Sequence, residues 1–284
     1  MNKLPISIVI PVSKDIKIKK CLESIKDDVE ILVVLNNNPS EEVVEIVKND
    51  KRCISVFLNT TGCNLAKAIN SGVEKAKNER IFIMNSDCIF SEEILRKANN
   101  ALVNFDVAKA HIVFLRTTYL ELLVARVRYL HNHVFNNNKS IFCPGMAFNK
   151  KIIGELGGYL FDEDMGWGED GDLSRRIHKA NLPYIFLKEE IMHAPESLSR
   201  DLKAAFRIGR GKRIRDYKDN ISLLKGIKNM FLEIVLDKKQ HIRISLKNER
   251  LMVTVYLLIW KIFYFLGYFY YINSKNVSNL WIKQ

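Results

Sequence analysis

The chain has 284 residues, 48% of them apolar, so it is long enough to bury a full core and too long for one small domain. Its net charge of +12 is spread along the chain and suits phosphate-bearing partners: nucleotides, nucleic acid or anionic lipid headgroups. The five cysteines are scattered and lack a CxxC pair, which argues against a disulfide framework and a structural zinc site.

Short apolar runs alternate with helical patterns through the first two-thirds of the chain. The predicted strands are residues 6–10, 31–35, 54–58 and 81–84. Between them, apolar residues at helical spacing predict helices near residues 18–25, 43–47 and 65–76, the last capped by Asn64. This alternation predicts an α/β fold with a mostly parallel sheet and helices on both faces, in which ligands bind beyond the carboxyl ends of the strands.

From about residue 100 the regular alternation of strand and helix patterns changes. Residues 107–115, 141–148 and 184–187 read as further strands, and residues 119–135 as a helix. The segment GGYLFDEDMGWGEDGDLSRRIHKA, rich in glycine and acid, runs into a helix, and the basic segment RIGRGKRIRDY follows His193. The N-terminus MNKLPISIVIPV lacks a signal-peptide layout, so we expect this part to stay inside the cell.

The C-terminal part differs from the rest. Residues 251–272 are apolar except for Lys261 and reach the length of about 20 residues that a bilayer span needs. A central lysine costs roughly 2.5–3.5 kcal/mol on insertion scales, so three alternatives stay open: a span, an interfacial helix or helix pair, and a buried packing or dimer helix. Basic residues before this segment favour a cytoplasmic position for the preceding part. We predict a main domain at residues 1–218 and a helical, membrane-associating segment at residues 219–284.

Three acidic residues are candidates for the chemistry of the site. Asp87 directly follows a predicted strand in the triplet Asn85-Ser86-Asp87, where a carboxylate suits Mg²⁺ or Mn²⁺, although Ser-Asp is also ordinary turn chemistry. Glu169 and Asp170 open a predicted helix; acids there complement the helix dipole, but one of them also suits a general base.

Residues beside these acids and further along the chain extend the candidate site. Trp167, beside Gly168, offers an apolar face for stacking on a sugar ring, or packs in the core. His193 could complete the metal site. Arg207 and Arg210, with glycines between the basic residues, predict a mobile loop that grips phosphate, or a solvated basic face.

Together, these segments resemble the inverting family 2 glycosyltransferases with the GT-A (Rossmann-like) fold, over roughly residues 6–217. The resemblance rests on ISIVIPV, VVLNNNPS, NLAKAINSGVEKAKNERIFIMNSD and the acidic loop with its Glu-Asp pair. After His193 the chain is similar to bacterial enzymes that build extracellular polysaccharides. The resemblance implies transfer of a sugar, with inversion, from a UDP-, GDP- or dTDP-sugar to a glycan or lipid-linked acceptor at the cytoplasmic face of the cell membrane.

The resemblance also implies residue roles. The nucleotide-sugar site would comprise Pro11, Val12, Asn36, Asn64, Asn70, Asn85, Ser86, Asp87, Arg207 and Arg210. Asp87, with His193, would hold Mg²⁺ or Mn²⁺, and Asp170 would be the base. Trp167, Gly168 and Glu169 would bind the acceptor.

Two departures from the family pattern concern the nucleotide side. Asn36 and Asn85 stand where the family usually has Asp, and Ile69 precedes Asn70 where an arginine is usual. These changes motivate an alternative, a catalytically silent, membrane-tethered binding protein. A nucleotidyltransferase is a second alternative, but PVSKDIK lacks the glycine-rich basic loop of that class. Nucleic-acid binding explains neither the acidic loop nor the hydrophobic segment, so no nucleic-acid partner is expected.

Overall fold

The structure is a computed structural model that describes residues 3–58, 64–135, 140–230, 232, 247 and 251–270. The described residues divide into two compact units, one within residues 3–113 and 141–194 and the other within residues 114–135 and 195–270. The predicted division into residues 1–218 and 219–284 stays a prediction. Residues 271 and 272 of the predicted hydrophobic segment lie outside the described part of the chain.

The first unit is built on an eight-stranded sheet of order β3-β2-β1-β4-β7-β6-β8-β5. The strands are β1 (Ile6–Val12), β2 (Glu30–Leu35), β3 (Cys53–Phe57), β4 (Arg80–Ile83), β5 (Cys88–Ile89), β6 (Val107–Phe114), β7 (Met146–Asn149) and β8 (Tyr184–His193). β1 pairs in parallel with β2 and β4, and β2 with β3. β7 is antiparallel to β4 and β6, and β5 is antiparallel to β8. The predicted α/β fold is confirmed, with a parallel N-terminal half and antiparallel pairs beyond β4.

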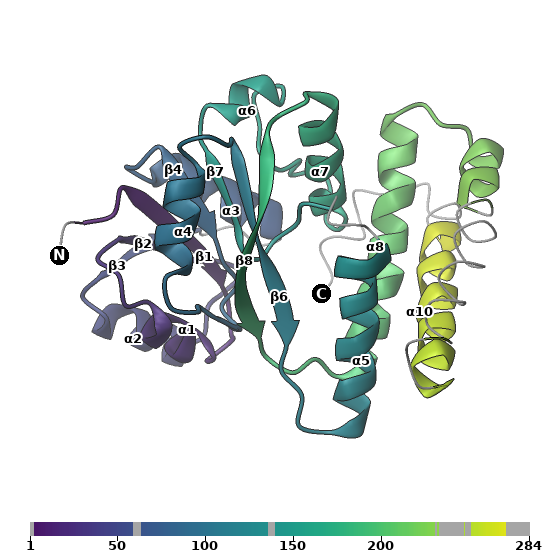
Figure 1. Cartoon of the computed structure of the whole chain (residues 1–284), viewed down its shortest axis with the longest axis horizontal. Coiled ribbons are helices and arrows are strands. Elements are labelled where there is room, and N and C mark those ends of the chain that lie inside the picture. Colours follow the sequence, from purple (N-terminus) through teal and green to yellow (C-terminus); the bar gives the residue numbers. More distant parts are fainter. Residues whose placement is uncertain are drawn as a thin grey trace. The chain divides into compact units, whose positions relative to one another are not determined.

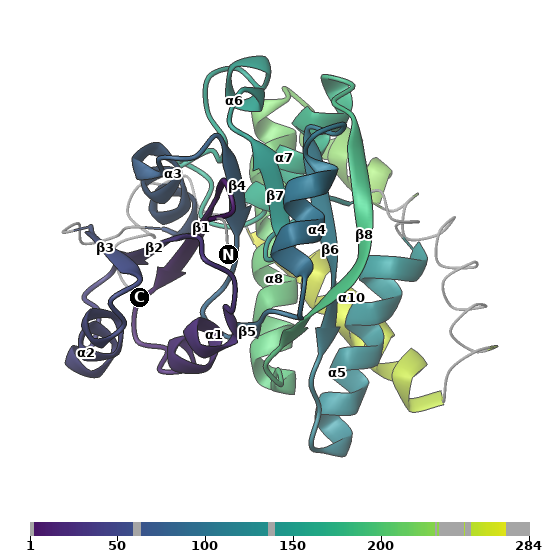
Figure 2. The ribbon, with the colours of Figure 1, turned by 60° about the vertical axis from the view of Figure 1, so that its left-hand side comes forward.

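Helices cover both faces of this sheet. They are α1 (Ile18–Ser24), α2 (Glu41–Asn49), α3 (Leu65–Lys75), α4 (Ile94–Ala101), α6 (Ile152–Glu155) and α7 (Glu169–Lys179). Figure 1 shows α4 in front of the sheet and α3 behind it, and Figure 2 gives a second view. Alternate side chains of the strands, such as Val9 and Ile83, join α3 and α7 in one buried cluster. Their neighbours in sequence, such as Ile8 and Phe82, are fully buried on the other face.

Close backbone approach on the α3 face explains one glycine. A Cβ added to Gly72 would collide with the side chain of Val9 in β1, so α3 can lie this near the sheet only with glycine at that position. The predicted cap of α3 is confirmed, because the Asn64 side chain accepts a hydrogen bond from Lys67 N at 2.8 Å.

Two predicted strands have different bounds. The strand predicted over residues 141–148 begins only at Met146, because Pro144 has no N–H for a ladder and Gly145 has a φ of +79°. The strand predicted over residues 184–187 runs on through Glu189 and Glu190, so that His193 is the last residue of β8.

The second unit is helical. It comprises α5 (Tyr119–Tyr129), which continues as a π-helical turn (Leu130–Phe135), α8 (Leu198–Lys218) and α10 (Leu251–Tyr270). Buried residues of these elements form a separate apolar cluster around Trp260. The mobile loop predicted at RIGRGKRI is wrong, because this segment lies inside α8.

A packing contact explains the glycines that suggested a loop. A Cβ on Gly209 of α8 would overlap the Tyr264 carbonyl oxygen of α10, and a Cβ on Gly267 would overlap the Phe206 carbonyl oxygen. Residues 206 and 209 therefore face residues 267 and 264 in an antiparallel crossing. The glycines allow two helix backbones to touch and do not mark flexibility.

Candidate active site

The carboxyl ends of β1 and β2 meet at one edge of the sheet. Pro11 and Val12 are buried at the end of β1, and Asn36 N donates to the Val12 carbonyl oxygen at 3.1 Å just after β2 ends. Asn37 and Asn38 both adopt a φ of +51°, a left-handed conformation that asparagine tolerates better than most residues. The predicted nucleotide-site residues Pro11, Val12 and Asn36 therefore lie side by side at this edge of the sheet.

The triplet Asn85-Ser86-Asp87 lies between β4 and β5. Ser86 is buried, and the buried Asn85 Oδ1 has no hydrogen-bond partner among the described residues. The backbone at Asp87 is held by the end of the neighbouring strand β8. Ala194 N donates to the Asp87 carbonyl oxygen at 2.8 Å, and Cys88 pairs with His193 across β5 and β8. The chain thus brings Asp87 and His193 together from distant parts of the sequence.

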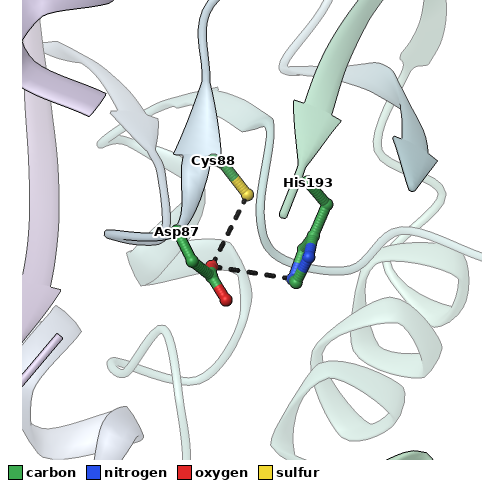
Figure 3. Close-up of side chains that lie close together, drawn as sticks. All are labelled: Asp87, Cys88 and His193. Atoms are coloured by element: carbon green, nitrogen blue, oxygen red, sulfur yellow. Dashed lines mark hydrogen bonds and ion pairs between the residues drawn. The ribbon is translucent and has the colours of Figure 1, made fainter. Parts of the chain in front are cut away.

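Asp87 and His193 point toward each other from these strand ends (Figure 3). Asp87 Oδ1 lies 3.6 Å from His193 Nε2. His193 Nδ1 lies 2.8 Å from the Ala194 carbonyl oxygen, so in the tautomer that donates to this carbonyl the Nε2 lone pair faces Asp87. Two acceptors at this distance fit a bridging cation. The carboxylate suits Mg²⁺ or Mn²⁺, and the imidazole suits a borderline metal.

Cys88 is the third member of this group of possible metal ligands. Burial raises the pKa of the Cys88 thiol well above its ordinary value, and the negative charge of Asp87 raises it further. The protonated thiol donates a hydrogen bond to Asp87 Oδ1, 3.8 Å from Cys88 Sγ.

Glu169 and Asp170 form the first turn of α7, after Gly168, which has a φ of +85°. Asp170 Oδ1 accepts a hydrogen bond from Cys143 N at 3.2 Å. Burial raises the pKa of Asp170, while the Cys143 N–H and the charge of Lys109 oppose that rise. Burial, and next the charge of Asp170, raise the pKa of Glu169, whose buried Oε2 has no hydrogen-bond partner among the described residues. The hydrogen bond from Cys143 N thus favours ionisation of Asp170 over ionisation of Glu169.

Lys109 is a site residue that the sequence reasoning missed. It lies in β6, its side chain is buried, and Nζ donates to the carbonyl oxygens of Ala110 at 2.6 Å and Pro144 at 2.9 Å. Burial lowers its pKa to about 8, although the negative charge of Asp170 acts in the opposite direction. Lys109 therefore acts electrostatically on both the Glu-Asp pair and the end of β5. A lysine in the middle of the apolar run VAKAHIVF was the available signal.

Asn64 and Asn70 connect α3 to the acidic loop. The Asn70 side chain donates to the Phe161 carbonyl oxygen at 2.8 Å and accepts from Phe161 N at 3.1 Å, and its Nδ2 lies 3.1 Å from Glu163 Oε1. Asn64 Nδ2 donates to the Glu163 carbonyl oxygen at 2.5 Å. Both amides thus hold the loop that precedes Trp167, and their predicted contact with the nucleotide sugar stays a prediction.

The remaining predicted residues fall into two groups. Trp167 keeps 37% of its surface exposed, as a stacking platform needs, and Gly168 provides the turn into α7. Arg207 and Arg210 lie in α8 of the second unit, away in the chain from the residues above, and their predicted phosphate contacts stay a prediction.

Comparison with known proteins finds a family model that matches this chain. Residues 7–157, which are more than half of the chain, match the sequence profile of glycosyl transferase family 2. The SPbeta prophage-derived glycosyltransferase SunS of Bacillus subtilis (strain 168) is 29% identical over 85 residues, covering 30% of this chain and 20% of SunS. An uncharacterized glycosyltransferase of Haemophilus influenzae is 28% identical over 120 residues, covering 39% of this chain and 47% of the relative. The matches therefore span less than half the length of these relatives.

Solved structures share the fold. The crystal structure of S. aureus TarS residues 1–349 matches with a TM-score of 0.52 and 16% identity, covering 94% of this chain and 91% of TarS. The same TarS region in complex with UDP-GlcNAc matches with a TM-score of 0.52 and 15% identity. At this identity the likeness concerns the fold alone.

Proposed function

The chain belongs to glycosyl transferase family 2, and from that premise we propose that it transfers a sugar, with inversion, from a nucleoside diphosphate donor to a hydroxyl of a glycan or lipid-linked acceptor. The observation that carries the proposal is the Asp170 carboxylate, held by Cys143 N near a buried lysine and next to a second carboxyl. Such a carboxylate suits a general base in a water-poor site.

In this reaction, Asp170 accepts the proton of the acceptor hydroxyl as its oxygen attacks the anomeric carbon. The bond between that carbon and the diphosphate oxygen breaks, and its electron pair leaves with the nucleoside diphosphate. A single displacement of this kind inverts the anomeric centre. Glu169, in its protonated form, can donate a hydrogen bond to the acceptor from the adjacent position.

Asp87 and His193 would hold a divalent cation, which supplies positive charge for the leaving diphosphate. Pro11, Val12 and Asn36 would line the nucleobase pocket. The carboxamide oxygen of Asn85, which has no hydrogen-bond partner among the described residues, would accept a hydrogen bond from a hydroxyl of the sugar donor. TarS has been solved with UDP-GlcNAc and with UDP, which supports UDP-sugars as the first donors to test, ahead of GDP- and dTDP-sugars.

We place the reaction at the cytoplasmic face of a membrane, in the synthesis of cell-surface glycans. The support is α10, whose length and mean hydropathy of 1.7 meet the requirement for a membrane helix, as those of a core helix can also do. Membrane association and glycosyl transfer are separate parts of this proposal and are tested separately.

The test of transfer uses the full-length protein. Calorimetric titration with UDP-GlcNAc and other UDP-, GDP- and dTDP-sugars, with and without Mn²⁺, should find one donor whose binding needs the cation and is lost in Asp87→Asn. The same donor should be turned over, measured as released nucleoside diphosphate. Asp170→Asn should lower that turnover by at least about 10³-fold with donor affinity unchanged. Normal turnover in Asp170→Asn would refute the assignment of Asp170 as the base. If the protein binds a donor but shows no turnover when membrane extracts supply the acceptor, the result favours the catalytically silent binding protein.

A further inference from the structure

Helix α10 is apolar on two sides. One side is buried, and includes Tyr256, Leu257, Trp260 and Tyr268. The other carries exposed large apolar side chains at helical spacing: Leu251, Met252, Val255, Ile259, Ile262, Leu266 and Tyr270. Ile262 and Leu266 are 57% and 51% exposed. This exposed stripe runs the whole length of α10, about 30 Å at 1.5 Å per residue.

The buried side of α10 is fastened to α8 near both of its ends. Tyr256 donates to Asp201 Oδ2 at 2.5 Å, and Tyr268 donates to Asp216 Oδ2 at 2.7 Å. Asp201 is fully buried and also accepts from Arg128 of α5 at 2.5 Å. The two tyrosines are about 18 Å apart along the helix, and the reciprocal glycine contacts fall between and beside them. α10 and α8 therefore form one packed pair over most of the length of α10.

Helix α8 cannot accompany α10 into hydrocarbon. Its sequence, LSRDLKAAFRIGRGKRIRDYK, carries basic or acidic residues in every turn, and charged side chains are costly at the centre of a bilayer. A spanning α10 would have to leave α8, which would break both Tyr–Asp hydrogen bonds and strip Asp201 of a donor. The packing thus excludes a span for as long as the helix pair stays intact.

We propose that α10 lies in the plane of an anionic membrane surface, with its exposed stripe immersed among the lipid acyl chains and α8 on the aqueous side. This inference rests on the membrane association proposed above and is independent of the sugar-transfer chemistry. It selects the interfacial helix from the three alternatives that the sequence left open.

Charge identifies lipid as the occupant of the stripe. α10 contains Lys261 and no acidic residue. Lys247, just before the helix, is exposed, and the sequence that precedes α10 also carries Lys238, Lys239, Arg243 and Arg250. Anionic headgroups complement these cations, and the long stem of Lys261 can carry its charge to the headgroup level. A second copy of the chain would instead bring the same basic groups against one another.

The test is flotation of the full-length protein with vesicles that contain phosphatidylglycerol, compared with vesicles of phosphatidylcholine alone. We expect flotation with the anionic vesicles, and its loss in Ile262→Glu/Leu266→Glu with an unchanged melting temperature. Val103 is 65% exposed in the first unit, so Val103→Glu is the matched control and should float normally.

Topology is then tested in the same anionic vesicles. An interfacial α10 predicts extraction by alkaline carbonate and a C-terminal tag that external protease cleaves. Resistance to carbonate together with a protected tag would show a span and overturn the inference while leaving membrane association intact. Failure of the unaltered protein to float overturns membrane association as well. A dimer in solution that Ile262→Glu/Leu266→Glu dissociates would show that a second copy covers the stripe.

Discussion

Replacing Gly209 with alanine tests whether the two helices of the second unit touch as described. Alanine normally stabilises a helix interior by about 1 kcal/mol relative to glycine. Here the new methyl group would overlap the Tyr264 carbonyl oxygen. This atom belongs to a helix backbone, so no rotamer change can relieve the overlap and the helices must separate.

The magnitude follows from these opposing terms. Overpacking a close contact costs about 3 kcal/mol at the upper end of its usual range, so the net loss in free energy of unfolding is about 2 kcal/mol. At roughly 2–4 °C per kcal/mol for a chain of this size, the melting temperature should fall by about 4–8 °C. Gly267→Ala should behave alike, because its methyl group would overlap the Phe206 carbonyl oxygen.

Gly154 provides the matched control. It lies in α6, and a Cβ at this position would meet no atom within 4 Å. Gly154→Ala should therefore raise the melting temperature slightly, by the usual gain of about 0.4–1 kcal/mol. Circular dichroism melts of the three variants measure the effect. If Gly209→Ala melts as high as Gly154→Ala, the close crossing of the two helices is wrong.

Three further variants test the site and its supports. Lys109→Met removes a positive charge near Asp170, so the pKa of Asp170 should rise further and the acid limb of the pH–turnover profile should move to higher pH. The control is Lys150→Met, which removes a lysine that donates to a backbone carbonyl and should leave the acid limb in place. Equal shifts of the acid limb in both variants would contradict the role of Lys109. Asn70→Ala breaks the paired hydrogen bonds to the acidic loop and should lower the free energy of unfolding by about 1–3 kcal/mol. Chemical denaturation measures this loss, and proteolysis of the acidic loop should become faster. A wild-type digestion pattern would argue that Asn70 does not hold the loop. Arg128→Met leaves a buried carboxylate without its cation and should cost about 3–5 kcal/mol, so a loss below about 1 kcal/mol on denaturant titration would show that the pair is solvated.

The pH dependence of turnover follows from the direction of one shift. The base acts only when ionised, and burial raises the pKa of Asp170 above its ordinary value. Turnover should therefore decline as the pH falls through this raised pKa, at a higher pH than an exposed aspartate would show. For stability the sign is opposite. Because the folded state holds its protons more tightly than the unfolded state, the contribution of this group is lost as the pH rises through the folded pKa.

The sequence predicted the elements whose stability is local. β1 and β2 are β-branched runs, and α3 has a capping asparagine and an apolar stripe, so pattern and propensity agree there. β5 is only two residues long and exists because it pairs with β8, a partner that no periodicity reveals. The segment around Gly209 was misread because glycine signals a loop locally, whereas the cause of the glycine is a contact with another helix.

The candidate site likewise contains residues whose positions the local sequence predicts and a residue whose position depends on tertiary contacts. The positions of Asp87, Glu169 and Asp170 could be predicted because they follow from strand ends and a helix start, and the roles assigned to these residues stay predictions. The position of Lys109 could not be predicted, because a lysine in a strand is ordinarily exposed on an edge or a face. Its burial depends on β7 and on the Pro144 carbonyl, which are brought to it by the tertiary fold.

The pairing of β5 with β8 also has a consequence for synthesis of the chain. Cys88 lies opposite His193, so the proposed cation site joins a carboxylate made early with an imidazole made much later. Contacts of such long sequence separation form late in folding, because the closure entropy of the intervening loop must be overcome first. A nascent chain that has emerged only as far as α7 already contains Asp87 and Asp170, yet it lacks the imidazole. The proposed cation site is therefore complete only after β8 has paired with β5.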